Sequence, residues 1–118
     1  MITDKNCIFC KIAQDEIKNE KLAETNNFFA ILDIHPKAKG HTLIIPKKHF
    51  GTLLDIPNTL GQELLEITKQ ISSNILDKKQ GNGFNVIMNN LACAGQVVMH
   101  AHLHIIPRKE NDGLKSIV

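Results

Sequence analysis

Between residues 95 and 108, three histidines alternate with apolar residues, and no other feature limits the fold of this chain so strongly. His100, His102 and His104 are interleaved with Met99, Ala101, Leu103 and Ile105. A period of two is typical of a strand that is buried on one face. On such a strand the three imidazoles share a face, with neighbouring Cα atoms ~7 Å apart, and the apolar residues turn toward the core. We therefore predict a strand that presents a row of imidazoles.

Three interpretations of this row are open at this point. The histidines could be solvated side chains on a polar strand face, although strict alternation of three argues against it. Alternate strand positions can also send two imidazoles to one Zn²⁺ ion. Alternatively, one neutral imidazole acts as a nucleophile while its neighbours bind substrate or transfer protons. The flanking sequence has to decide between them.

The rest of the chain predicts further strands. Short apolar runs at 21–26 and 28–34, separated by asparagines, indicate a β-hairpin, and residues 83–89 alternate well enough for another strand. The run from His41 to Pro46 is almost continuously apolar, which is typical of a central strand covered on both faces. With a long helix between these strands, the sequence predicts an α+β fold, an antiparallel sheet with helices to one side.

One long helix is predicted between Pro57 and Gln80. Its apolar residues recur at steps of three or four, namely Leu60, Leu64, Ile67, Ile71 and Ile75. Thr59 with Gln62 three residues later resembles a capping box, and Gly81 is placed to end the helix. One apolar stripe and one charged face describe a helix that packs across a sheet, so we expect a structural role for it.

Cys7 and Cys10 form a Cys-x-x-Cys pair near the amino terminus. Such a pair can be half of a metal site, a redox couple, or two unrelated small residues. A redox couple of the thioredoxin kind should follow a core strand, whereas only six largely polar residues precede this pair. A metal site is therefore the preferred interpretation. With three cysteines and no export signal, a disulfide framework is not expected.

Length and composition bound the remaining possibilities. A chain of 118 residues with 42% hydrophobic residues predicts one domain over residues 1–118. The net charge of +2 and the absence of Trp and Tyr argue against a nucleic-acid partner, because such proteins are strongly basic and stack bases on aromatic rings. No apolar run approaches ~18 residues, so we expect no membrane association and a cytoplasmic location.

The run His100, His102, His104, Ile105, Ile106 closely resembles the signature of the histidine-triad (HIT) superfamily, and flanking similarity to its bacterial-type nucleotide-binding members extends from Cys7 to Arg108. The resemblance implies a HIT-like fold, an antiparallel sheet of about five strands per subunit with one long helix and a short N-terminal helix. It also implies a homodimer in which the two sheets join.

The resemblance assigns roles by position. The implied catalytic set is His102 as nucleophile, with His104, His41 and His100; His104 and His41 would bind phosphoryl oxygens. Residues that would enclose the purine base are Ile8, Phe9, Ile12, Ile31 and Leu43, and Asp33 would accept hydrogen bonds from the ribose hydroxyls. Positions on the phosphate side are Asn89, Gly95, Gln96 and the backbone N–H of Val97. His102 must be neutral to attack phosphorus, so it needs an acceptor on its other ring nitrogen, and in the family a backbone carbonyl fills that position.

The implied function is hydrolysis or transfer of nucleotides, with purine nucleoside 5′-phosphoramidates as substrates, AMP as the bound nucleotide and a covalent nucleotidyl-His102 intermediate. A structural Zn²⁺ would be held by Cys7, Cys10, His49 and His100, and no metal is expected at the reacting phosphate. Two alternatives are a dinucleoside polyphosphate hydrolase and a nucleotide-binding adaptor module with little catalysis. A third is a zinc enzyme that uses the three histidines as ligands.

Overall fold

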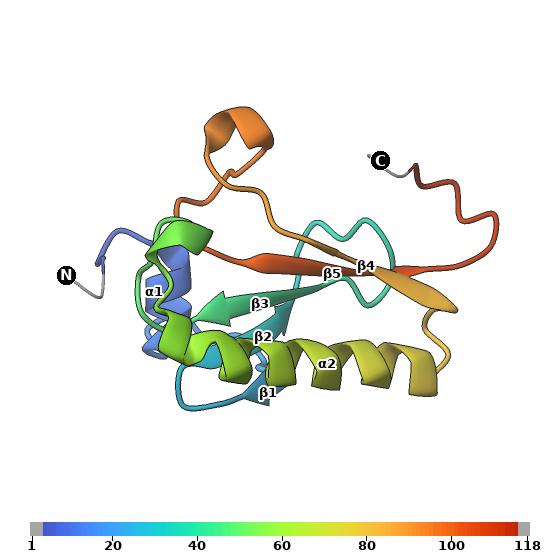
Figure 1. Ribbon diagram of the computed structural model, residues 1–118, viewed down its shortest axis with the longest axis horizontal. Helices are drawn as coiled ribbons and strands as arrows, with labels where there is room; N and C mark the ends of the chain where they lie inside the picture. The colour runs from blue at the N-terminus through green and yellow to red at the C-terminus, as the bar shows by residue number, and fades with distance from the viewer. Residues whose placement is uncertain (1–3, 116–118) are drawn as a thin grey trace.

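The computed structural model describes residues 4–115, and within them it contains a five-stranded antiparallel sheet and two α-helices (Figure 1). The strands are β1 (Ala23–Glu24), β2 (Phe28–Leu32), β3 (Thr42–Pro46), β4 (Gly83–Ile87) and β5 (Leu103–Arg108). The helices are α1 (Ile8–Ala13) and α2 (Gly61–Asp77), and three short 3-10 helices, η1 (Leu53–Asp55), η2 (Asn58–Leu60) and η3 (Ala92–Ala94), lie in the connections. These elements confirm the predicted α+β fold.

The sheet has the order β1-β2-β3-β5-β4, so the last strand in sequence lies between β3 and β4. All five residues of β3 are buried, which agrees with the prediction of a central strand. The predicted hairpin is also present, because β1 and β2 pair antiparallel. Strand β4 forms one edge of the sheet.

The two faces of the sheet carry separate apolar clusters. Alternate residues of β2 divide between them: Phe28 packs with the apolar stripe of α2, and Phe29 packs with residues of α1. The helices therefore cover opposite faces, and the prediction of helices to one side was wrong. Successive side chains of a strand point to opposite faces, and β2 is apolar at every position while β3 is apolar from Leu43 to Pro46. Both faces of these strands therefore need a cover.

The strand that carries the histidines begins later than predicted. Strand β5 starts at Leu103, so only His104 of the triad lies within the ladder. The Ala101 amide donates to the carbonyl of Phe50 at 2.7 Å. Met99 is 46% exposed, and His100, Ala101 and His102 are all buried, so burial does not alternate ahead of β5. Within β5, Leu103 and Ile105 pack in the cluster under α2, as the alternation predicts.

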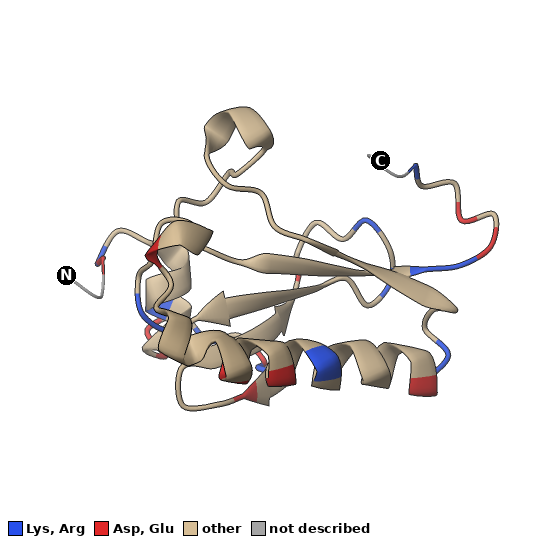
Figure 2. Cartoon of the chain, in the orientation of Figure 1, with Lys and Arg blue, Asp and Glu red and all other residues tan. Residues whose placement is uncertain are grey.

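Helix α2 is shorter than the predicted span. Its N-cap is Leu60 without a side-chain hydrogen bond, so the capping box predicted at Thr59 is absent, and Gln62 donates instead to Glu66. A capping box is present in η1, formed by Thr52 and Asp55. Strands β2, β3 and β4 carry no charged residue, whereas charged residues lie on both α-helices, in the loops and in β1 and β5 (Figure 2). Over residues 4–115, no helix is long and apolar enough to cross a membrane.

Gly81 does not end helix α2 as predicted, because the helix already stops at Asp77. The glycine meets a different requirement. A Cβ atom at this position would lie 2.8 Å from the carbonyl oxygen of Gly83 and 3.0 Å from the amide of Arg108. Only glycine allows the chain to pass so close to the ends of β4 and β5.

Candidate functional site

Four imidazoles gather on the face of the sheet that α2 does not cover. His104 lies opposite Leu43 in the β3–β5 ladder. Its ring centroid is 5.0 Å from that of His102 and 5.2 Å from that of His41. Phe9 of α1 packs its ring against both His100 and His102. The structure thus brings together all four histidines that sequence analysis assigned to catalysis.

The ring of His102 is oriented by the main chain. Its Nδ1 lies 2.7 Å from the carbonyl oxygen of His100, and both are buried. A carbonyl oxygen can only accept, so Nδ1 carries the proton and donates. The lone pair of neutral His102 is therefore on Nε2, which is free to attack an electrophile. This backbone carbonyl is the partner that sequence analysis expected.

Asp33 joins His41 and His104 in a polar group next to His102. Oδ2 of Asp33 lies 3.4 Å from Nε2 of His41 and 3.8 Å from Nδ1 of His104. The two imidazoles face each other, with Nε2 of His41 3.0 Å from Nδ1 of His104. Burial lowers the pKa of His104 to about 4 and also lowers the pKa of His41, so both rings are neutral at neutral pH.

The apolar residues that sequence analysis assigned to the base pocket lie in one cluster, with one exception. Phe9, Ile12, Ile31 and Leu43 belong to the core cluster on the α1 face of the sheet. Ile8 is 45% exposed and is not a member of that cluster. Whether these residues enclose a base stays a prediction.

The phosphate-side residues lie on the loop between β4 and β5. Gly95 has φ +98°, and a Cβ there would approach the Asn89 side chain at 3.4 Å, so glycine suits this position. Val97 is 89% exposed. Gln96 is 3% exposed.

The Gln96 side chain is fully engaged within the protein. Its Oε1 accepts from the amide of Leu91 at 2.7 Å, and its Nε2 donates to the carbonyls of Gly51 at 2.7 Å and Val98 at 3.1 Å. The side chain thus braces the loop from inside. Sequence analysis placed Gln96 at the phosphate and did not foresee this bracing role.

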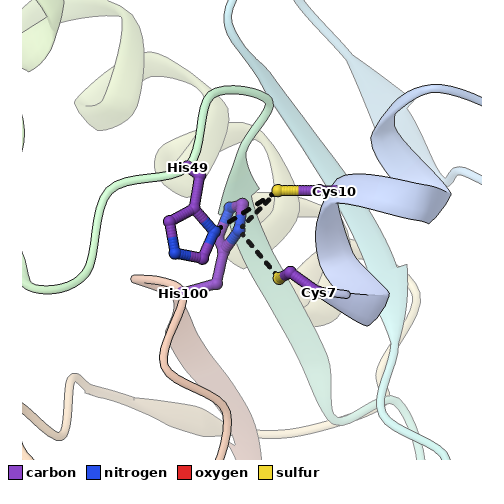
Figure 3. Close-up of side chains that lie close together, drawn as sticks. All are labelled: Cys7, Cys10, His49 and His100. Carbon is purple, nitrogen blue, oxygen red and sulfur yellow. Dashed lines mark hydrogen bonds between the residues drawn. The ribbon is translucent and has the colours of Figure 1, made fainter. Parts of the chain in front are cut away.

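A second group of side chains converges at the other end of the triad (Figure 3). It consists of Cys7, Cys10, His49 and His100, whose donor atoms all lie within 4.8 Å of one another. Sγ of Cys7 lies 3.4 Å from Nδ1 of His100, and Sγ of Cys10 lies 3.3 Å from Nδ1 of His49. In a tetrahedral zinc site, neighbouring sulfur and nitrogen ligands lie ~3.6 Å apart. The four residues fit such a site.

The tautomer of His100 also suits a metal ligand. Its Nε2 lies 2.7 Å from the carbonyl oxygen of Pro46, so this nitrogen donates and the lone pair is left on Nδ1, which faces the cysteines. Burial raises the pKa of the Cys10 thiol to about 11, so in the absence of metal this thiol keeps its proton.

The triad does not converge on a single ion. Among residues 4–115, two groups of donor atoms lie close enough to share a cation. One takes His100 with the cysteines, the other takes His104 with Asp33 and His41, and neither includes His102. This division excludes the alternative in which the three histidines are the ligands of one catalytic zinc.

Several partners in this site were missed by sequence reasoning. The carbonyls of Pro46 and Phe50 and the amide of Lys37 are main-chain groups, which almost every residue type supplies. No sequence pattern predicts which of these main-chain groups will bind a side chain. His49 is the one ligand far from any motif, and only the resemblance pointed to it.

The sequence of this chain matches a family model and several known proteins. A family model described as HIT domain matches residues 14–111. The chain is 43% identical over 109 residues to "Adenylylsulfatase HINT3" of Arabidopsis thaliana, covering 92% of this chain and 55% of that protein. It is 42% identical over 114 residues to "Adenosine 5'-monophosphoramidase HNT1" of Candida albicans, covering 93% of this chain and 75% of that protein.

A solved structure is similar over most of the chain. It is a zinc-bound histidine triad family protein from Mycobacterium smegmatis, with a TM-score of 0.85 and 34% sequence identity. The match covers 92% of this chain and 79% of that chain.

We predict that Gln96→Ala destabilises the protein in the absence of any ligand. The change leaves the carbonyl of Gly51 and the amide of Leu91 without their partner, and an unsatisfied buried polar group costs ~1–3 kcal/mol. Urea denaturation measures the loss. Val97→Ala, at an exposed neighbouring position, should stay within ~0.5 kcal/mol of the original chain. Equal stability of the two variants would contradict the bracing role.

Proposed function

The chain belongs to the HIT domain family, and on that premise we propose that it is a nucleotide hydrolase or transferase that forms a covalent nucleotidyl-His102 intermediate. The observation that carries this proposal is the tautomer of His102, whose Nδ1–H is held by the His100 carbonyl and whose Nε2 lone pair is left to attack. Relatives named adenosine 5'-monophosphoramidase and adenylylsulfatase support an AMP-related substrate.

The proposed first step is attack of Nε2 of His102 on the α-phosphorus of a purine nucleoside 5′-phosphoramidate. A P–N bond to His102 forms, the bond to the leaving amine breaks, and the amine takes up a proton from the solvent, which the later hydrolysis returns. The ring of His102 becomes positively charged as the bond forms. Its Nδ1–H then donates to the His100 carbonyl as a charge-assisted hydrogen bond, which stabilises the intermediate. Water subsequently releases the nucleoside monophosphate.

The remaining residues of the face have matching tasks in this proposal. Asp33 is half-buried beside the triad, where its carboxylate suits the two hydroxyls of a ribose. Ile31 and Leu43 belong to the apolar cluster on the same face and suit the purine base. His104 neighbours the nucleophile and suits the phosphoryl oxygens.

His102→Asn should abolish turnover of an adenosine phosphoramidate and keep AMP binding, because it removes the attacking nitrogen and leaves the rest of the face. His35→Asn, at an exposed loop position, is the matched control and should retain the original rate. The measurement is steady-state turnover together with intact mass after a denaturing quench at alkaline pH, where P–N bonds persist.

Only His102 should carry a nucleotidyl adduct. Near-normal turnover by His102→Asn, or an adduct mapped to His104, would overturn the assignment. Nucleotide binding with no turnover by the original chain would favour an adaptor module instead. Faster turnover of dinucleoside polyphosphates than of phosphoramidates would favour the other hydrolase.

We also propose a structural Zn²⁺ at Cys7, Cys10, His49 and His100. The donor set supports it, because two thiols and two imidazoles at tetrahedral spacing are a common closed zinc shell. When bound, the ion would tie α1 to the segments that follow β3 and precede β5. The zinc-bound relative from Mycobacterium smegmatis is in agreement with this proposal.

Protein purified without metal-affinity resin or chelator should contain zinc, and Cys10→Ser should lose both the metal and thermal stability. Binding to the folded state alone stabilises a protein by ~2.7 kcal/mol at a hundredfold excess of free metal over Kd. Cys93→Ser, at an exposed cysteine, is the control and should retain metal and stability. Elemental analysis and thermal denaturation give the two readouts. A metal-free original chain as stable as Cys10→Ser would refute the site.

We further propose that the chain forms a homodimer through the α2 face of the sheet at β4. Strand β4 has an edge without a partner strand in the described part of the chain. Beside it lies an almost wholly apolar groove of about 490 Å³, lined by Gly61, Leu64, Leu65, Thr68, Lys69, Ser72, Phe84, Val86 and Leu103. A second copy supplies both a strand for the edge and apolar side chains for the groove.

Val86→Glu should convert the dimer to a monomer, because it places a charge in the apolar groove. Sedimentation analysis of the original chain should give twice the 13.2 kDa mass of one chain, and the variant should give 13.2 kDa. Leu54→Glu, at a position that is 91% exposed, is the control and should remain dimeric. A monomeric original chain, or a dimer that survives Val86→Glu, would rule out this interface.

A further inference from the structure

We propose that the main-chain N–H of Lys37 fixes the tautomers of His41 and His104, so that His104 offers an N–H donor from Nε2 to the ligand. His41 is then a positioning residue that acts through His104 and does not touch the ligand. The inference deepens the proposed function, on which its kinetic consequences rest. Its structural part concerns only where two protons reside, and it can be tested without substrate.

The main chain makes the Nδ1 atom of His41 a hydrogen-bond acceptor. This atom lies 3.0 Å from the amide nitrogen of Lys37. A main-chain N–H can only donate, so Nδ1 must accept and cannot carry a proton. Neutral His41 therefore carries its proton on Nε2. Protonating both nitrogens would set two N–H groups against each other in a side chain that is 2% exposed.

The tautomer of His41 in turn fixes the tautomer of His104. Nε2 of His41 faces Nδ1 of His104 at 3.0 Å. Since His41 donates from Nε2, Nδ1 of His104 must accept. Neutral His104 then carries its proton on Nε2, at the opposite side of the ring from His41. Neither of these two hydrogen bonds uses the Nε2–H of His104, so this group is available to an oxygen of the ligand.

His102 and His104 therefore have opposite tautomers. His102 is held by a carbonyl, so its proton is on Nδ1 and its lone pair is on Nε2. His104 is held indirectly by an amide, so its proton is on Nε2. Two adjacent histidines of one motif thus become one nucleophile and one donor, because one is held by an acceptor and the other by a donor.

The charged and titratable groups around the pair are Asp33, Lys37 and His102. Burial is the largest influence and lowers the pKa of both rings, while the Asp33 carboxylate raises both values by a smaller amount. The pair is therefore neutral at neutral pH, as the tautomer argument requires. Oδ2 of Asp33, 3.4 Å from Nε2 of His41, also favours a proton on that nitrogen.

The tautomers also argue against a cation at Asp33, His41 and His104. A metal bound to Nε2 of His41 would displace the proton from that nitrogen. The proton would then have to move to Nδ1, where the Lys37 amide already donates. Close spacing of three donor atoms is thus explained by hydrogen bonding between the histidines.

Nitrogen-15 NMR of the full chain, uniformly labelled, reads the tautomers directly through two-bond couplings to the ring protons at pH 7.5. We expect Nε2–H for His41 and His104, and Nδ1–H for His102. Single His→Asn variants assign the signals. A proton on Nδ1 of either His41 or His104 would overturn the proposal, whatever the activity of the protein.

Kinetics supply a second test with two variants, each of which keeps one of the two hydrogen bonds of His41. The Asn amide can reach the position of Nδ1, so His41→Asn keeps a partner for Lys37 but has no donor for His104. The longer Gln amide can reach the position of Nε2, so His41→Gln restores the donor. We expect His41→Asn to lower kcat about two- to tenfold, the effect of one neutral hydrogen bond, and His41→Gln to lower it less than twofold.

KM should be unchanged in both variants, because His41 does not touch the ligand. His35→Asn is the control for general effects on this loop. Equal losses of kcat in the two variants, or a rise in KM in both, would mean that His41 contacts the ligand or serves only packing. If the original chain turns over no substrate, the proposed function fails while the NMR result still decides the tautomers.

Discussion

His100 is the residue on which the rest of the site depends, because its polar groups act in three directions from a fully buried position. Its Nε2 donates to the carbonyl at the end of β3, and its Nδ1 faces the two cysteines of the amino-terminal segment. Its own carbonyl accepts from His102. One residue thus joins three distant parts of the chain. Any displacement of His100 moves the ring of His102 as well.

The fold was largely predictable because it rests on side-chain periodicity. The apolar run of β3, the hairpin of β1 and β2 and the stripe of α2 were all legible in the sequence. The predictions were wrong where main-chain hydrogen bonds determine where an element begins. Helix α2 begins after a 3-10 turn, and β5 begins only at Leu103 because the Ala101 amide pairs with a loop. The placement of α1 on the second face was also missed, although β2 is apolar at every position.

The candidate site was harder to predict than the fold, because main-chain groups determine more of it. The spacing of the histidines indicated the site, and the resemblance supplied the four members of the Cys/His group. What each imidazole can do is decided by a carbonyl or an amide that carries no sequence signal. Gln96 illustrates the opposite case, because its residue type suits a phosphate ligand while its contacts show an internal brace.

The strand order has a consequence for how the protein is made. Strand β5, near the carboxyl end, lies between β3 and β4, both of which precede it in the chain. During synthesis β3 and β4 therefore emerge first, each with an edge that lacks its eventual neighbour. His41 and His104 are 63 residues apart, and Cys7 and His100 are 93 apart. A nascent chain that ends before Leu103 leaves one edge of β3 and both edges of β4 open, which favours pairing with other chains, and it lacks the strand that carries His104. Completion of the sheet and completion of the face that carries the histidines are the same event.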